Sequence, residues 1–163
     1  MEKILKKVYE KQRLAKFLHL FSHFVVLLYC LGFLLVMYAS YERSIISVLK
    51  SFLILFVPFV LVSIFRRALN APRPYELYDF YEKAPKDKSG RSFPSRHAFS
   101  AFAIGAFMLF CYPVIGAVML FFALLLCVCR VLLGIHFIRD VLAGALVGVL
   151  TSVLGALIFT PFN

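Results

Sequence analysis

The sequence predicts an all-α integral membrane protein: a helical bundle of about five transmembrane helices with an amphipathic interfacial helix at its N-terminus. Of the 163 residues, 63% are hydrophobic and 16% are charged, whereas a soluble domain averages roughly 45–50% and about 25%. The mean hydropathy is +0.91. Because a small soluble domain cannot bury so much apolar surface, the composition excludes a soluble enzyme, a disordered chain and a coiled coil.

Five apolar stretches account for the predicted spans, each of which needs ~20 mainly apolar residues. They lie at residues 17–40, 45–65, 98–112, 113–129 and 141–160. The third stretch is short unless its helix begins before Ala98. The dipeptide Tyr112-Pro113 predicts a tight turn between the third and fourth spans.

Residues 1–16 are too polar to cross the bilayer. Six basic residues alternate there with aliphatic ones, a pattern typical of an amphipathic helix on a membrane surface. We therefore divide the chain into this interfacial helix, residues 1–16, and one five-span domain, residues 17–163.

Two polar segments, residues 66–97 and 130–140, interrupt the hydrophobic pattern and are the expected active-site segments. Two spans joined by a turn lie between them, so the chain crosses the membrane twice and returns to the same face. A further pair of crossings leads back to the N-terminal helix. All three polar regions are therefore expected on one side of the membrane.

That side collects arginines next to two histidines and a carboxylate. The set is Arg66, Arg67, Arg73, Arg96, Arg130 and Arg139, with His97, His136 and Asp140. Guanidinium groups are always charged and pair bidentately with phosphate oxygens. The formal net charge of +10 could serve nucleic acid, anionic lipid or a phosphorylated substrate. Because most of the chain lies in lipid, we expect no nucleic-acid partner.

The histidines predict acid–base or nucleophilic chemistry. His136 and Asp140 share a face if their helix is continuous, or stand at a loop that enters the last helix. In both cases the carboxylate can reach one imidazole nitrogen and leave the other as nucleophile or base. His97 stands where a helix begins, and the first backbone N–H groups with Ser95 offer an anion cradle. Too few carboxylates are present for a magnesium site, which favours phosphoryl transfer through a phosphohistidine.

Three spaced motifs carry a family resemblance. They are Arg66-x6-Arg73-Pro74, Pro94-Ser95-Arg96-His97 and Arg130-x5-His136-x3-Asp140. In this order they resemble the type 2 phosphatidic acid phosphatase superfamily, whose signatures are Lys-x6-Arg-Pro, Pro-Ser-Gly-His and Ser-Arg-x5-His-x3-Asp. The resemblance covers residues 66–140 directly.

The resemblance implies a role for each matching residue. His136 would attack the phosphorus, Asp140 would orient it, and His97 would protonate the leaving oxygen. The phosphoryl oxygens would be held by side chains from all three motifs: Arg66, Arg73, Ser95 and Arg130. Members similar to this chain need no metal, and we expect no cofactor.

Three positions depart from the family pattern. Arg66 stands where the family usually has Lys, which keeps the charge but changes the reach. Cys129 replaces the Ser before Arg130, which removes a hydroxyl donor. Arg96 replaces the usual Gly, where it could add a phosphate contact, select a diphosphate headgroup, or point outward. We assign Arg96 to substrate binding.

The function expected from these features is hydrolysis of a membrane lipid phosphate. Phosphatidic acid, phosphatidylglycerophosphate and undecaprenyl diphosphate are all compatible, with the tail admitted laterally from the bilayer. Two alternatives stay open: a non-catalytic lipid-binding scaffold, and an oxidoreductase similar to the vanadium haloperoxidases, which are larger and soluble. The oligomeric state is left undetermined.

The distribution of basic residues bears on the orientation of the protein in the membrane. All but two of the 18 basic residues, Arg43 and Lys50, lie on the motif-bearing side. Basic residues favour the cytoplasm, whereas the family resemblance favours the outer face, where bacterial relatives that recycle polyprenyl diphosphates typically work. In the last span, Gly144, Gly148 and Gly155 predict close helix packing within one bundle rather than dimerisation.

Overall fold

The computed structural model describes residues 2–78 and 89–159, and the elements in these ranges are helices. In chain order they are α1 (Glu2–Glu10), α2 (Gln12–Tyr41), α3 (Ile45–Leu69), α4 (Pro74–Leu77), α5 (Arg96–Cys111), α6 (Pro113–Leu132) and α7 (Ile138–Phe159). The predicted all-α class is confirmed. The tight turn expected at Tyr112-Pro113 joins α5 to α6.

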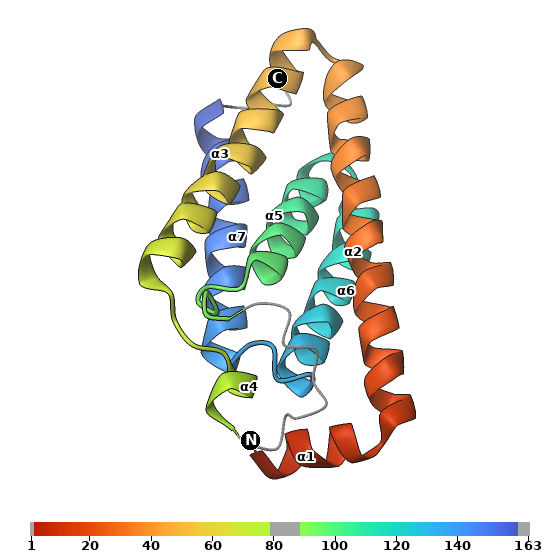
Figure 1. Ribbon diagram of the computed structural model, residues 1–163. Coiled ribbons are helices and arrows are strands. Elements are labelled where there is room, and N and C mark those ends of the chain that lie inside the picture. The colour runs from red at the N-terminus through yellow and green to blue at the C-terminus, as the bar shows by residue number, and fades with distance from the viewer. Residues whose placement is uncertain (1, 79–88, 160–163) are drawn as a thin grey trace.

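Five helices run alongside one another, and α5 lies at their centre (Figure 1). Within the described residues, four apolar segments are long enough to cross a membrane: α2, the segment Ile45–Leu77 that contains α3, α6, and α7. The central helix α5 has 16 residues, about 24 Å at 1.5 Å per residue, which is less than the ~30 Å hydrocarbon core. It begins at Arg96, two residues before the expected start. The protein is a multi-pass membrane protein in which the short central helix α5 contacts the four longer helices around it.

Small residues let α7 pack closely against α5. A Cβ added at Gly144 would collide with the carbonyl oxygen of Ser95, and one at Gly148 with the carbonyl oxygen of Phe99. A Cβ added at Gly155 would collide with the side chain of Ile54 in α3. The glycines therefore serve packing within one bundle, as predicted from their spacing.

The described parts of both polar segments lie at the same end of the bundle as α1 (Figure 1). The backbone N–H of Ser95, just before α5, donates to the carbonyl oxygen of Asp140 in α7 at 2.8 Å. This contact joins the second and third motifs directly. The prediction that the two polar segments meet at one end, made from the number of membrane crossings, is confirmed.

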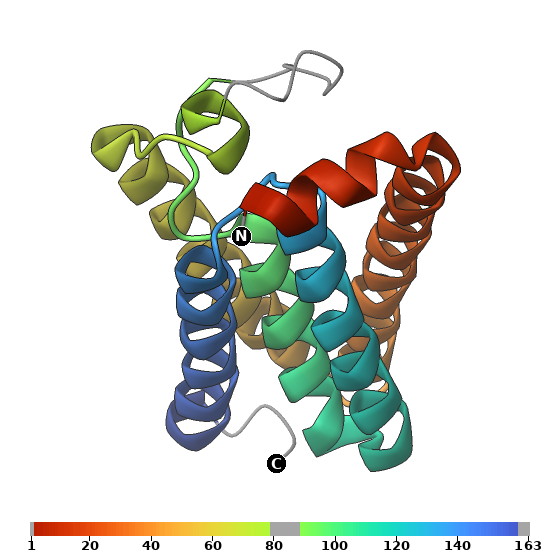
Figure 2. The same ribbon diagram turned by 90° about the horizontal axis from the view of Figure 1, so that it is seen from below.

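The N-terminal helix α1 crosses this end of the bundle (Figures 1 and 2). Two of its apolar side chains pack on the protein: Leu5 is buried against Tyr75 of α4, and Val8 belongs to a buried cluster with Leu133. The hydroxyl of Tyr9 donates to the Leu133 carbonyl oxygen at 3.0 Å. The helix ends at Glu10, so residues 12–16 belong to α2 rather than to the interfacial segment. The sequence predicted that the apolar face of this helix lies on the membrane; in the structure Leu5 and Val8 of that face are covered by the protein itself.

Candidate active site

Arg66 is the buried cation at the end of α3. It lies in the last helical turn, before Asn70 ends the helix in the left-handed region with a φ of 44°. Its guanidinium donates to the carbonyl oxygen of Pro94 at 2.8 Å and to that of Arg91. These bonds fasten the segment before α5 to α3. A guanidinium has five N–H donors, so others remain for the phosphoryl contact expected from the sequence.

Arg73 lies at the start of the short helix α4. Its Nε donates to the carbonyl oxygen of Gly90 at 2.9 Å. The Glu76 carboxylate accepts the backbone N–H of Arg73 at 2.7 Å and that of Gly90 at 2.6 Å. These bonds hold α4 against the segment that leads into α5 and keep Arg73 at the motif-bearing end.

Ser95 is the N-cap of α5. Its buried hydroxyl accepts the backbone N–H of Ala98 at 3.4 Å. It therefore lies at the predicted helix N-terminus, but its oxygen already caps the helix. The hydroxyl acts here only as an acceptor, so its O–H remains able to donate to a phosphoryl oxygen, the role predicted for Ser95 from the sequence.

Arg130 and His97 join α6 to α5. The Nη2 atom of Arg130 lies 2.9 Å from Nδ1 and 3.4 Å from Nε2 of the His97 ring. Because a guanidinium can only donate, the nearer histidine nitrogen accepts. The motif-two histidine and the motif-three arginine therefore lie in direct contact, a detail beyond the shared membrane face that the sequence predicts.

His136 lies in the short loop between α6 and α7. Gly134, with a φ of +63°, takes the left-handed conformation that glycine adopts without steric cost. The backbone N–H groups of Ile135 and His136 then return to the Arg130 carbonyl oxygen at 3.1 and 3.3 Å. Of the two arrangements left open by the sequence, the loop that enters the last helix is the one observed.

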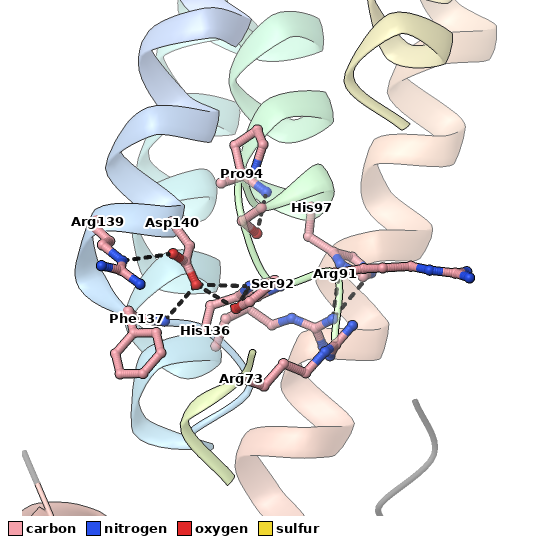
Figure 3. A network of polar contacts seen from close by, with 12 residues as sticks. Arg73, Arg91, Ser92, Pro94, His97, His136, Phe137, Arg139 and Asp140 are labelled. Carbon is pink, nitrogen blue, oxygen red and sulfur yellow. Dashed lines mark hydrogen bonds and ion pairs between the residues drawn. The ribbon is translucent and has the colours of Figure 1, made fainter. Parts of the chain in front are cut away.

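Ser92 lies between His136 and Asp140 (Figure 3). Its hydroxyl oxygen is 2.5 Å from Asp140 Oδ2 and 3.3 Å from His136 Nδ1. The direct distance from His136 Nδ1 to Asp140 Oδ2 is 3.6 Å, longer than a hydrogen bond. The Asp140 carboxylate thus faces Nδ1 of His136, as the sequence predicts, and Ser92, which no sequence motif indicated, bridges the two side chains. The spacing of residues in the sequence does not identify Ser92, because Ser92 reaches α7 only through the irregular path of the segment before α5.

Asp140 is held from several sides at the start of α7. Its Oδ2 also accepts the backbone N–H of Phe137 at 2.9 Å. The Nε of Arg139 lies 3.6 Å from Oδ1, although that arginine side chain is itself exposed. Asp140, His136 and Ser92 are at most 1% exposed. The carboxylate is thus fixed before any ligand arrives.

The predicted site residues converge on His97. Arg130, His136, Arg96 and Arg66 lie near enough to act on it electrostatically. Within residues 2–78 and 89–159, no group of three or more His, Cys, Asp or Glu side chains could hold a metal ion. The site is therefore a cluster of guanidinium and imidazole groups around one buried carboxylate.

An apolar cavity of about 560 Å³ adjoins this cluster. It lies between α2, α3 and α5, with walls that include Phe33, Leu55 and Ile104. Arg96 and His97 line it at the N-terminus of α5. The arrangement places a hydrophobic volume, large enough for part of a lipid chain, beside the charged cluster.

A comparison with protein families decides the identity. Residues 47–162 match the sequence profile of the PAP2 superfamily, which includes all three motifs. The chain belongs to the PAP2 superfamily. No match was found among curated protein sequences.

A solved PAP2 structure shares the fold. It is described as the first transmembrane PAP2 type phosphatidylglycerolphosphate phosphatase from Bacillus subtilis, with a TM-score of 0.65 and 22% sequence identity. The match covers 99% of this chain and 85% of that one. PAP2 membership together with this transmembrane fold supports a membrane lipid phosphatase in general.

Electrostatics make the His136 ring of this PAP2 protein neutral. Burial lowers the pKa of His136 to about 4, against the opposing effect of Asp140, and Arg130, Arg73 and Arg66 lower it further. The neutral ring has one N–H and one free lone pair. With Nδ1 facing Ser92 and Asp140, a proton on Nδ1 leaves the lone pair on Nε2.

Proposed function

We propose that this PAP2 protein hydrolyses a phosphate group from a membrane lipid, with His136 as the nucleophile. The observation that carries the proposal is the buried chain of contacts from Asp140 through Ser92 to His136, beside His97 and Arg130. A neutral imidazole with one oriented N–H and one free nitrogen is the form that attacks phosphorus.

In the first step, His136 Nε2 forms a bond to phosphorus while the bond from phosphorus to the leaving oxygen breaks. His97 protonates that oxygen. The proton donor is the imidazolium form of His97, which becomes neutral as the proton leaves. The negative charge of the bound phosphate favours that form, whereas in the ligand-free protein Arg130 donates to Nδ1 of the neutral ring. The product of this step is the dephosphorylated lipid and a phosphohistidine at position 136.

In the second step, water attacks the phosphohistidine and gives a proton to His97. The bond between His136 and phosphorus breaks, and inorganic phosphate leaves. Arg66, Arg73 and Arg130 supply fixed positive charge for the equatorial oxygens in both steps, which is how positioned cations stabilise phosphoryl transfer. No residue of this scheme requires a metal ion.

The apolar cavity supplies the lipid specificity. A hydrocarbon chain between α2, α3 and α5 would leave its headgroup at His97, one of the residues that line the cavity. Phosphatidic acid, phosphatidylglycerophosphate and undecaprenyl diphosphate each fit this arrangement. A soluble phosphate ester lacks the tail and gains nothing from the cavity.

Inorganic phosphate release by the purified protein in detergent micelles tests the proposal. We expect release from at least one of phosphatidic acid, phosphatidylglycerophosphate and undecaprenyl diphosphate, and far less from glycerol 3-phosphate. Arg130→Ala should lower the rate by about 10²-fold or more, as expected for loss of an electrostatic donor. Arg67→Ala is the matched control, because Arg67 is an exposed arginine near the same site.

Absence of phosphate release from all three lipids would contradict the proposal and favour a non-catalytic lipid-binding protein. Halide oxidation that depends on added vanadate would instead favour the oxidoreductase alternative. Phosphate release and halide oxidation are measured on the same protein preparation, so the two results can be compared directly.

A further inference from the structure

Arg96 is a cation in the wall of an apolar cavity. It lines the cavity with His97 and Ser100, and its guanidinium carbon lies 5.7 Å from the centroid of the Phe59 ring. Phe59 precedes Arg66 by seven residues on α3, which corresponds to about 10 Å along a helix axis. The Arg96 charge is therefore displaced from the motif-one arginine toward the membrane interior.

No carboxylate balances this charge in the part of the chain that the structure describes. The close contacts found there between a carboxylate and a basic side chain both involve Asp140, one with the neutral His136 ring and one with Arg139. The Phe59 ring compensates a cation only in part, and Arg96 is only partly buried, so its guanidinium remains accessible to an anion on a ligand. An anionic group on the ligand would supply the missing partner.

The position of Arg96 restricts which anion this can be. Arg66, Arg73 and Arg130 already surround the proposed phosphoryl group. Arg96 lies next to His97, the proposed acid for the leaving oxygen, and on the side of the apolar cavity. A charge there faces whatever connects the leaving oxygen to the hydrocarbon tail.

We infer that Arg96 binds a second phosphate group of the substrate, located between the reacting phosphate and the hydrocarbon chain. The inference rests on the proposed function and makes the site selective for lipids that carry two phosphates. Two lipid types share this chemistry: a prenyl diphosphate, and a terminal phosphomonoester joined through glycerol to a phosphodiester. Phosphatidic acid and prenyl monophosphates have no such group.

The reaction balances for both types. A lipid diphosphate and water give a lipid monophosphate and inorganic phosphate, as the bridging P–O bond breaks and His97 protonates the bridging oxygen. A phosphatidylglycerophosphate and water give phosphatidylglycerol and inorganic phosphate. Arg96 stabilises the retained phosphate in each case and forms no covalent bond.

Matched substrate pairs test the inference through the ratio of kcat/KM values. One pair is a prenyl diphosphate and the monophosphate of the same prenol. The other is phosphatidylglycerophosphate and phosphatidic acid with the same acyl chains. The wild-type protein should prefer the two-phosphate lipid in at least one pair, and that pair identifies the lipid type.

Arg96→Gln should lower this ratio by about tenfold or more, mainly through a higher KM for the two-phosphate lipid, as expected for loss of a charged hydrogen bond. Arg96→Gly, which installs the usual family residue, should do the same, and Arg96→Lys should retain part of the preference. Arg67→Gln should leave the ratio unchanged.

Equal ratios in wild type, Arg96→Gln and Arg96→Gly for both pairs would overturn the inference. In that case continued phosphate release from the monophosphates would show that the proposed function stands without it. Absence of release from all four lipids by the wild-type protein would instead contradict the proposed function itself.

Discussion

The Ser92 hydroxyl determines how Asp140 can act on His136. Its oxygen is 2.5 Å from the carboxylate and 3.3 Å from the ring nitrogen, whereas carboxylate and ring are 3.6 Å apart. Asp140 therefore orients His136 largely through Ser92. Ser92 is a positioning residue in the proposed reaction, because it touches the nucleophile and not the phosphate.

Ser92→Ala should lower kcat by about tenfold, the effect of losing one buried hydrogen bond, and leave KM nearly unchanged. If Ser92 acts with Asp140, the double variant Ser92→Ala/Asp140→Asn should be no slower than Asp140→Asn alone. Ser63→Ala, which removes a hydroxyl bonded within α3, is the control. If the decreases in kcat of the two single variants instead combine fully in the double variant, Ser92 and Asp140 act independently, which would contradict this role of Ser92.

Titration of the His136 ring tests the electrostatic account. Because burial lowers the pKa of His136 to about 4, the ring should stay neutral across pH 5–8, whereas an ordinary histidine has a pKa of about 6.5. The unfolded chain then binds a proton that the folded chain does not, so stability falls as pH drops from about 6.5 to about 4 and changes no further from this group below that. NMR of ¹⁵N-histidine protein, assigned with a His136→Gln variant, measures the ring directly. A midpoint near 6.5 would contradict the account.

The contact between α5 and α7 positions the second and third motifs. The backbone of Ser95 bonds to that of Asp140 at 2.8 Å, and Gly144 permits this approach because it has no Cβ. Close approach through glycine is a general means of helix association in membranes. The geometry of the site thus depends on the packing of two helices.

Gly144→Ala should separate these helices and lower stability by about 1–3 kcal/mol, a typical cost of overpacking, together with a loss of phosphatase activity. Leu146→Ala, on the exposed side of the same helix, should change both much less. Thermal unfolding in detergent and phosphate release measure the two effects. Wild-type stability and activity in the glycine variant would show that the contact is not required.

Hydropathy predicted the spans well because each buries its apolar surface in lipid or in neighbouring helices. The number of membrane crossings likewise predicted that the two polar segments lie at the same end of the bundle, but not that His97 and Arg130 are in direct contact. Contacts that depend on the path of irregular segments were not predictable, including the Ser92 bridge and the Arg66 bonds to backbone carbonyl groups. The placement of Leu5 and Val8 against the bundle was missed for the same reason, since a periodic pattern does not identify its partner surface.

The distribution of charge over the whole chain predicts its orientation. With Arg43 and Lys50 as the only basic residues on the far side in the sequence, the motif end should face the cytoplasm. Lys11 and Glu42 are exposed at opposite ends of α2. In intact cells, a membrane-impermeant thiol reagent should label Glu42→Cys, and Lys11→Cys only after permeabilisation. The reverse pattern would place the site on the outer face, as the family resemblance suggests.

In the proposed reaction, the ring of His136 performs the chemistry at the site where the two polar segments meet. Phosphate release from a lipid phosphate by purified wild-type and His136→Ala proteins, with equal folding verified by thermal unfolding, is the most direct test. The account predicts robust release by the wild type and a loss of at least about 10³-fold in the variant. Undiminished turnover by His136→Ala would contradict it.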